Sequence, residues 1–206
     1  AAIRECQAFA GRFPDSPEIH NLLGIAYRRT GQLEEALEEY NRVIVLQPGI
    51  PEIHFNMGIA LSKLGRSEEA CAQYRWAVSL NPDYAKAYAN LAFEYLRQGE
   101  QDEAETLARK ALAIYPEMAK ALSTLGGALI LKGDLEGAES VSRRALELDP
   151  LLADARNNLG CIYLRRGEME SAAAELKAAI KLDPRYPEAH YNLGRTFFMM
   201  GDFAQA

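Results

Sequence analysis

The chain has 206 residues, of which 49% are hydrophobic and 25% are charged, and its formal net charge is −6. This composition is ordinary for a folded globular protein and excludes wholesale disorder. The negative charge argues against a nucleic-acid or polybasic membrane surface, and no apolar run approaches the roughly 20 residues that a membrane span needs.

The prolines mark a repeat of 34 residues. Six of the nine are spaced by that period, namely Pro14, Pro48, Pro82, Pro116, Pro150 and Pro184. The other three share a second position three residues later, namely Pro17, Pro51 and Pro187. Because proline breaks helices, this distribution indicates that one short helical unit repeats along the chain.

Counted from residue 17, the repeat divides the chain into a single array. A truncated unit at 1–16 holds a second helix that runs to about residue 13, and a partial repeat at 187–206 holds a first helix that runs to about residue 200. Five full repeats are expected between them, at 17–50, 51–84, 85–118, 119–152 and 153–186.

Small residues recur at fixed positions of the unit. Position 15 is always glycine, at Gly31, Gly65, Gly99, Gly133, Gly167 and Gly201, and position 20 is always alanine. Apolar residues three and four apart on both sides of position 15 predict two amphipathic helices per unit. The glycine supplies the left-handed turn that ends the first helix, and the proline ends the second. We expect the small residues at positions 8 and 20 to face each other, so that the two backbones approach closely.

Units such as the one from Ala85 to Pro116 resemble tetratricopeptide repeats, and the resemblance covers the whole chain. It implies an all-α fold, a right-handed superhelical solenoid of antiparallel helix pairs. The first helices would line a concave groove, and the second helices would form the outer wall.

The resemblance places the groove lining at positions 2, 5, 6, 9, 12 and 13 of the first helices. Many of these residues are apolar, and a contiguous exposed apolar patch usually marks a binding site. We predict a peptide-binding groove that includes Phe55, Ile59, Phe93, Leu96, Gly127, Ile130, Cys161 and Leu164. Gly127 is expected to leave a gap for a bulky partner side chain. The alternative is that neighbouring first helices cover much of this surface.

A row of amides at position 6 belongs to the same predicted groove. Its members are Asn56, Asn90, Asn158 and Asn192. An amide side chain offers both donors and an acceptor, so it can grip the backbone of an extended peptide whatever the peptide sequence.

Charge is divided between the two kinds of helix. Positions 1–14 of the six units hold 11 Lys and Arg but 5 Asp and Glu, a balance of +6, so the rest of the chain carries −12. Part of this follows from the helix dipole, which favours cations such as Arg166 at helix C-termini and anions such as Glu34 at N-termini. We expect the groove rim to tolerate an acidic or neutral ligand.

Two residues depart from the repeat. Trp76 stands at position 26, where the other full repeats have Arg42, Lys110, Arg144 and Ala178. A lone tryptophan among solvated positions is typical of an interface anchor, so Trp76 is a candidate contact on the outer face, although lone surface aromatics without a role are also common. Glu94 stands at position 10, and we expect it to pair with Arg97 one turn later.

No pattern indicates catalysis, a metal or a cofactor. His20, His54 and His190 all occupy position 4, which makes them stacked structural equivalents rather than ligands or bases. The three cysteines lie in different units and at different repeat positions, namely at Cys6, Cys71 and Cys161. Units stack at a spacing on the order of 20 Å, too far for a disulfide. Free thiols favour a reducing compartment such as the cytoplasm, although the localisation stays open.

We therefore predict a protein–protein interaction scaffold, not an enzyme, that binds an extended or helical peptide segment in the concave groove. Its partners would be proteins or peptides, with no nucleic acid and no membrane span. Two alternatives remain open: a substrate-recognition arm of a larger enzyme, as in O-GlcNAc transferases, and an envelope or pilus assembly factor. Self-association through the half repeats is also open, because their apolar faces lack cover.

Overall fold

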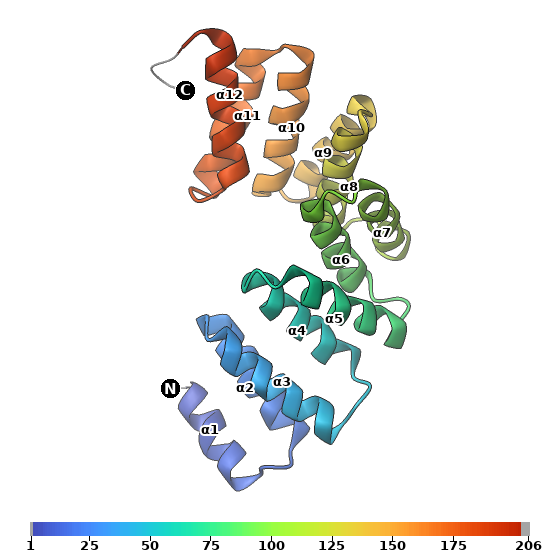
Figure 1. Cartoon of the computed structure of the whole chain (residues 1–206), viewed down its shortest axis with the longest axis vertical. Helices are drawn as coiled ribbons and strands as arrows, with labels where there is room; N and C mark the ends of the chain where they lie inside the picture. The colour runs from blue at the N-terminus through green and yellow to red at the C-terminus, as the bar shows by residue number, and fades with distance from the viewer. Residues whose placement is uncertain (1, 203–206) are drawn as a thin grey trace. The chain divides into compact units, whose positions relative to one another are not determined.

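The computed structural model describes residues 2–202, and twelve α-helices lie in this range (Figure 1). The first helices of the repeats are α2 (Pro17–Thr30), α4 (Pro51–Lys63), α6 (Ala85–Gln98), α8 (Ala119–Lys132), α10 (Ala153–Arg166) and α12 (Pro187–Met200). The second helices are α1 (Ala2–Arg12), α3 (Leu33–Leu46), α5 (Ser67–Leu80), α7 (Gln101–Ile114), α9 (Leu135–Leu148) and α11 (Met169–Leu182). The predicted all-α fold of paired helices is confirmed. The end of the predicted partial repeat, residues 203–206, lies outside the described range.

The helix boundaries follow local signals in the sequence. At the start of α2, Pro17 occupies the first turn and the Ser16 side chain accepts a hydrogen bond from the Ile19 backbone N–H. At its end, Gly31 has a φ of 83°, a left-handed conformation that side chains other than glycine rarely adopt. Every full repeat ends its second helix two residues before a proline, as α3 does at Leu46. These signals are local, which explains why the sequence predicted them.

The helices form two compact units, one ending at Glu94 and the other beginning at Tyr95, so that the division falls inside α6. In the first unit α1 packs on α2, α2 on α3, α3 on α4, and α4 on α5. In the second, each helix from α7 to α12 packs on the next, and α10 also contacts both α8 and α12. The expected single array over 1–206 remains a prediction.

A tight contact joins the two helices of a repeat at positions 8 and 24. A Cβ atom on Gly24 would lie 2.6 Å from Cε1 of Tyr40, and one on Gly160 would lie 2.5 Å from Cγ of Leu176. Real Cβ atoms do not approach other atoms this closely, so glycine makes room for the side chain from the second helix. The nearest neighbours of Gly24 and Gly160 come from position 24, and not from position 20 as predicted.

Ion pairs link several repeats to the one before them. Lys132, at the end of α8, places its Nζ 2.8 Å from both Asp102 Oδ1 and Glu105 Oε2 on α7. One repeat later, Nη1 of Arg166 lies 2.5 Å from Oε2 of Glu139 on α9. Lys132 holds the pKa of Glu105 below its ordinary value. These pairs are largely solvated and contribute little stability each, but they use part of the positive charge of the first helices inside the array.

The contact at position 8 yields a test with a matched control. We expect Gly24→Ala to lower the melting temperature, because the new methyl group must displace the Tyr40 ring, and overpacking typically costs about 1–3 kcal/mol. Gly194 occupies the same repeat position, but no atom of the described residues lies within 4 Å of its ideal Cβ. Gly194→Ala should therefore leave the melting temperature unchanged or raise it, since alanine favours helix by about 1 kcal/mol. Thermal unfolding followed by circular dichroism measures both, and an equal effect of the two substitutions would contradict the packing argument.

Candidate functional site

In the first unit, five predicted groove residues lie on α4 and α6 and are all half-buried. They are Phe55, Asn56, Ile59, Asn90 and Phe93. The Phe55 ring packs against two tyrosines, with its centroid 5.0 Å from that of Tyr84 and 6.0 Å from that of Tyr74. The Phe55 ring is thus held by aromatic neighbours, while part of its surface remains open to water.

The Asn90 amide is already engaged within this unit. It hydrogen-bonds to the hydroxyl of Tyr74, the side chain that lies across Gly58. Burial raises the pKa of Tyr74, and the charge of Glu94 raises it further, while the bond to Asn90 opposes the shift. Asn90 therefore contacts the second helix of the preceding repeat.

In the second unit, two asparagines of the row bond to the preceding first helix. Asn158 is buried, and its Nδ2 donates to the backbone oxygen of Ser123 at 2.8 Å. The Nδ2 of Asn192 lies 3.1 Å from both Asn157 Oδ1 and Cys161 Sγ. These amides connect neighbouring repeats, so their donors face the array.

The remaining predicted groove residues of this unit are also largely covered. Ile130 and Leu164 are each 6% exposed. The side chain of Leu96 fills the space beside Gly127, since a Cβ placed there would lie 2.6 Å from Leu96 Cδ2. The gap expected at Gly127 is therefore occupied by Leu96. Within this unit, the neighbouring first helices do cover much of the predicted lining.

Several first-helix residues outside the predicted set are more exposed than the residues within it. They are Leu22 (57%), Leu131 (49%), Tyr191 (68%), Phe198 (64%) and Met199 (54%). All of them stand at positions 5, 6, 12 or 13, which the family resemblance assigns to the groove. An apolar residue at these positions was the available signal.

Glu94 is nearly fully buried, with 1% of its surface exposed. Its carboxylate accepts hydrogen bonds from the hydroxyl of Ser67 at 2.5 Å and from that of Ser62. Two serines on α4 and α5 therefore solvate this charge, contacts that spacing along α6 could not predict.

Two of the histidines at position 4, His20 and His54, link the two helices of their repeats. Nδ1 of His20 lies 2.5 Å from Oε2 of Glu39, and Nδ1 of His54 lies 2.8 Å from Oε1 of Gln73. In the repeat at 153–186, Arg156 takes the place of histidine and bonds to a glutamate at the same position as Glu39. The same link is thus built with different chemistry, as expected of structural equivalents.

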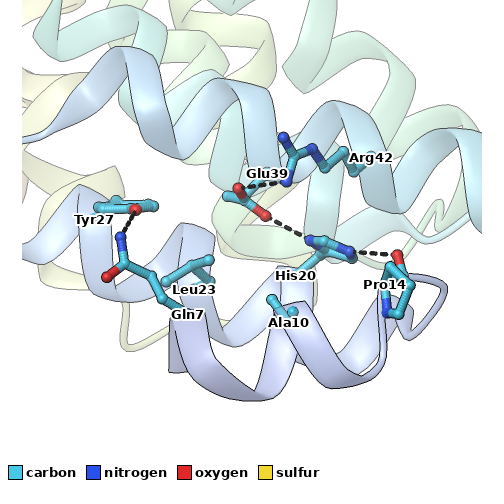
Figure 2. A pocket seen from close by; sticks show the side chains of 9 residues that line it. Gln7, Ala10, Pro14, His20, Leu23, Tyr27, Glu39 and Arg42 are labelled. Atoms are coloured by element: carbon cyan, nitrogen blue, oxygen red, sulfur yellow. Dashed lines mark hydrogen bonds and ion pairs between the residues drawn. The ribbon is translucent and has the colours of Figure 1, made fainter. Parts of the chain in front are cut away.

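The His20 link extends into a partly buried network (Figure 2). Nε2 of His20 lies 2.8 Å from the backbone oxygen of Pro14, and Nη1 of Arg42 donates to Oε1 of Glu39 at 3.1 Å. Both ring nitrogens of His20 therefore face acceptor atoms.

Within residues 2–202, no group of three or more His, Cys, Asp or Glu side chains is arranged to hold a metal ion. No helix in the same range combines the length and apolar character that crossing a bilayer requires.

Comparison with protein families covers most of the chain. One model, described as TPR repeat, matches residues 26–65 and 160–201. Three others, each described as tetratricopeptide repeat, match residues 49–117, 90–153 and 142–174. Together these segments run without a gap from residue 26 to residue 201. The chain belongs to the tetratricopeptide repeat family.

Solved structures share the fold of this tetratricopeptide repeat chain. A chain of the APC/C hetero-tetramer Cut9–Hcn1 superposes with a TM-score of 0.84 at 18% identity. The match covers 95% of this chain but 39% of the Cut9–Hcn1 chain. MamA 41-end from Desulfovibrio magneticus RS-1 gives a TM-score of 0.68 at 23% identity, covering 83% of this chain and 97% of that one. YrrB gives 0.66 at 19% identity, covering 90% and 96%. At such identities the likeness concerns the fold. A search of curated protein sequences found no match.

Cys161 provides a test of how well the first helices of the second unit are covered. Burial raises the pKa of its thiol to about 11, against a smaller opposing effect of Arg165 and Arg195. In a variant with Cys6 and Cys71 replaced by alanine, we expect iodoacetamide to react very slowly at pH 7.5, since roughly 0.1% or less of the thiol is then ionised, and faster as the pH approaches 11. Labelling followed by mass spectrometry measures this. The same variant in urea should label fully, and rapid labelling of the folded chain at pH 7.5 would contradict the burial.

Proposed function

We propose that this tetratricopeptide repeat chain is a protein-interaction scaffold that binds an extended or short helical segment of a partner on the exposed face of its first helices. The tetratricopeptide fold supports a general role in protein interaction. The observation that carries the finer proposal is the half-buried apolar surface on α4 and α6, made by Phe55, Ile59 and Phe93. Aromatic side chains held rigid on one side and open on the other lose little entropy when a partner covers them.

Apolar anchors, more than an amide ladder, would supply the affinity. The donors of Asn158 and Asn192 are committed to neighbouring helices, and Asn90 bonds to Tyr74. A net gain of about 0.5–1.5 kcal/mol per hydrogen bond would be reduced further if a peptide had to displace such partners. Burial of one phenylalanine contributes about 1.5–3 kcal/mol, which makes the apolar surface the stronger source.

The descriptions of two similar solved structures support a role in binding peptides or proteins. YrrB is described as a tetratricopeptide repeat protein with an unusual peptide-binding site, and Cut9–Hcn1 is an APC/C assembly. Proteins of this family are generally non-catalytic scaffolds, and we propose the same for this chain.

Paired substitutions test the first-helix face. We expect the double variant Phe55→Ala and Phe93→Ala to lose partner binding by at least about tenfold, because truncating a central aromatic anchor commonly costs 2 kcal/mol or more. The matched control replaces Phe9 and Phe13, each 51% exposed on or next to α1, by alanine. Both variants make the same chemical change, so a loss confined to the first supports the assignment.

The partner is found by photo-crosslinking. A benzophenone amino acid at Ile59 should crosslink a partner segment that mass spectrometry identifies, whereas one at the exposed Glu103 on α7 should not. The identified segment, made as a labelled peptide, then serves for the affinity measurements. Unchanged affinity of the Phe55/Phe93 variant, with helical content preserved by circular dichroism, would refute the proposal.

A further inference from the structure

Two pockets in the first unit occupy equivalent places in successive repeats. One, of about 500 Å³, is lined by α1, α2 and α3; the other, of about 430 Å³, is lined by α3, α4 and α5. Each contains the position-4 histidine with its position-23 partner and a proline at position 32. They differ most at position 26, which is Arg42 in the first pocket and Trp76 in the second. The repeat has thus produced two copies of one pocket with different chemistry.

The first pocket is polar and has spare donors (Figure 2). Both carboxylate oxygens of Glu39 accept hydrogen bonds, one from His20 and one from Arg42, and Nε2 of Gln7 donates to the Tyr27 hydroxyl at 2.8 Å. The Arg42 side chain is 57% exposed and uses one of its five N–H donors for Glu39. The N–H groups of Arg42 that Glu39 does not use are therefore available to a carboxylate placed in the pocket.

The second pocket is apolar and aromatic. Trp76 is 58% exposed and stacks on His54, with ring centroids 6.0 Å apart and an interplanar angle of 24°. Ile44, Met57 and Leu80 complete the apolar lining, and no Asp or Glu is among the residues that line it. With no carboxylate to balance a cation, the pocket suits a large apolar side chain.

A third hollow, of about 300 Å³, joins the two pockets. It shares Pro14 and Arg42 with the first and Asn41 with the second, and Val45, 83% exposed, lines it. The three hollows therefore form one continuous surface along α3, called here the α3 groove. All of its residues belong to the unit that ends at Glu94.

We propose that the α3 groove is a second binding surface, distinct from the first-helix face, for a partner protein segment that places a large apolar side chain against Trp76 and a carboxylate against Arg42. Charge complementarity decides the anionic end, because the free N–H groups of Arg42 gain a charge-assisted bond there. Trp76 and Val45 supply the exposed apolar area that a partner would cover. The groove then holds a short acidic–apolar motif at two points one repeat apart.

The probe is a phage-displayed library of random 12-residue peptides selected on the full chain. We expect the recovered peptides to combine Asp or Glu with a large apolar residue. Trp76 is the single tryptophan of the chain, so its emission should shift to the blue when a recovered peptide without tryptophan binds. A motif rich in Lys or Arg, or unchanged Trp76 emission, would overturn the proposal.

Variants locate the binding. Trp76→Ala should weaken binding of a labelled recovered peptide by about tenfold or more, and Arg42→Ala by about fivefold or more. The fold tolerates alanine at this position, since Ala178 occupies it in the repeat at 153–186. Lys110→Ala, at the same position in the second unit, is the matched control and should leave the affinity unchanged. Equal affinity for wild type and Trp76→Ala would overturn the α3 groove.

The same measurements separate this proposal from the proposed function. The Phe55→Ala and Phe93→Ala variant should bind the recovered peptides with unchanged affinity, while losing the partner found by crosslinking at Ile59. A loss of peptide binding in that variant would assign the peptides to the first-helix face and overturn the α3 groove. Sedimentation at the concentrations used tests whether a second copy of the chain occupies the α3 groove. A dimer that Trp76→Ala abolishes would also overturn the proposal.

Discussion

The contact between position 8 of the first helix and position 24 of the second is the constraint on which each repeat depends. Where position 24 carries a large side chain, as in Tyr40 or Leu176, position 8 is glycine, and the side chain lies across the helix that the glycine belongs to. Where position 24 is the small Ala108, position 8 is Ala92, and both are fully buried. The volume shared by the two positions is thus divided differently in different repeats, as close packing of an interior requires.

With the pair of helices held in this way, other positions vary without loss of the fold. The link between positions 4 and 23 is made by histidine with glutamate, by histidine with glutamine, or by arginine with glutamate. The pockets next to the first two of these links differ in their hydrogen-bond donors and in their apolar surface. This freedom produces a polar pocket at Arg42 and an aromatic one at Trp76 from one architectural unit.

The first helices of the two units differ in how much of their side-chain surface is covered. In the second unit, Asn158 and Leu164 are buried by neighbouring first helices, and Leu96 fills the space beside Gly127. In the first unit, Phe55 and Phe93 remain half open to water. The same helix positions can therefore pack against neighbouring helices in one repeat and remain accessible in another. A side chain is accessible to a partner only where its own neighbours leave it uncovered.

The sequence by itself determined the helix pairs and their ends, because Pro17, Gly31 and the residues like them act through backbone conformations within a few residues. It also predicted that Trp76 is exposed, whereas the groove on the first helices remains a prediction. It could not tell that Glu94 is bonded to Ser62 and Ser67, or that Asn158 bonds to Ser123. Those contacts join residues about one repeat apart. Only the tertiary structure decides them, because they depend on how neighbouring helices are turned and how much water each side chain loses.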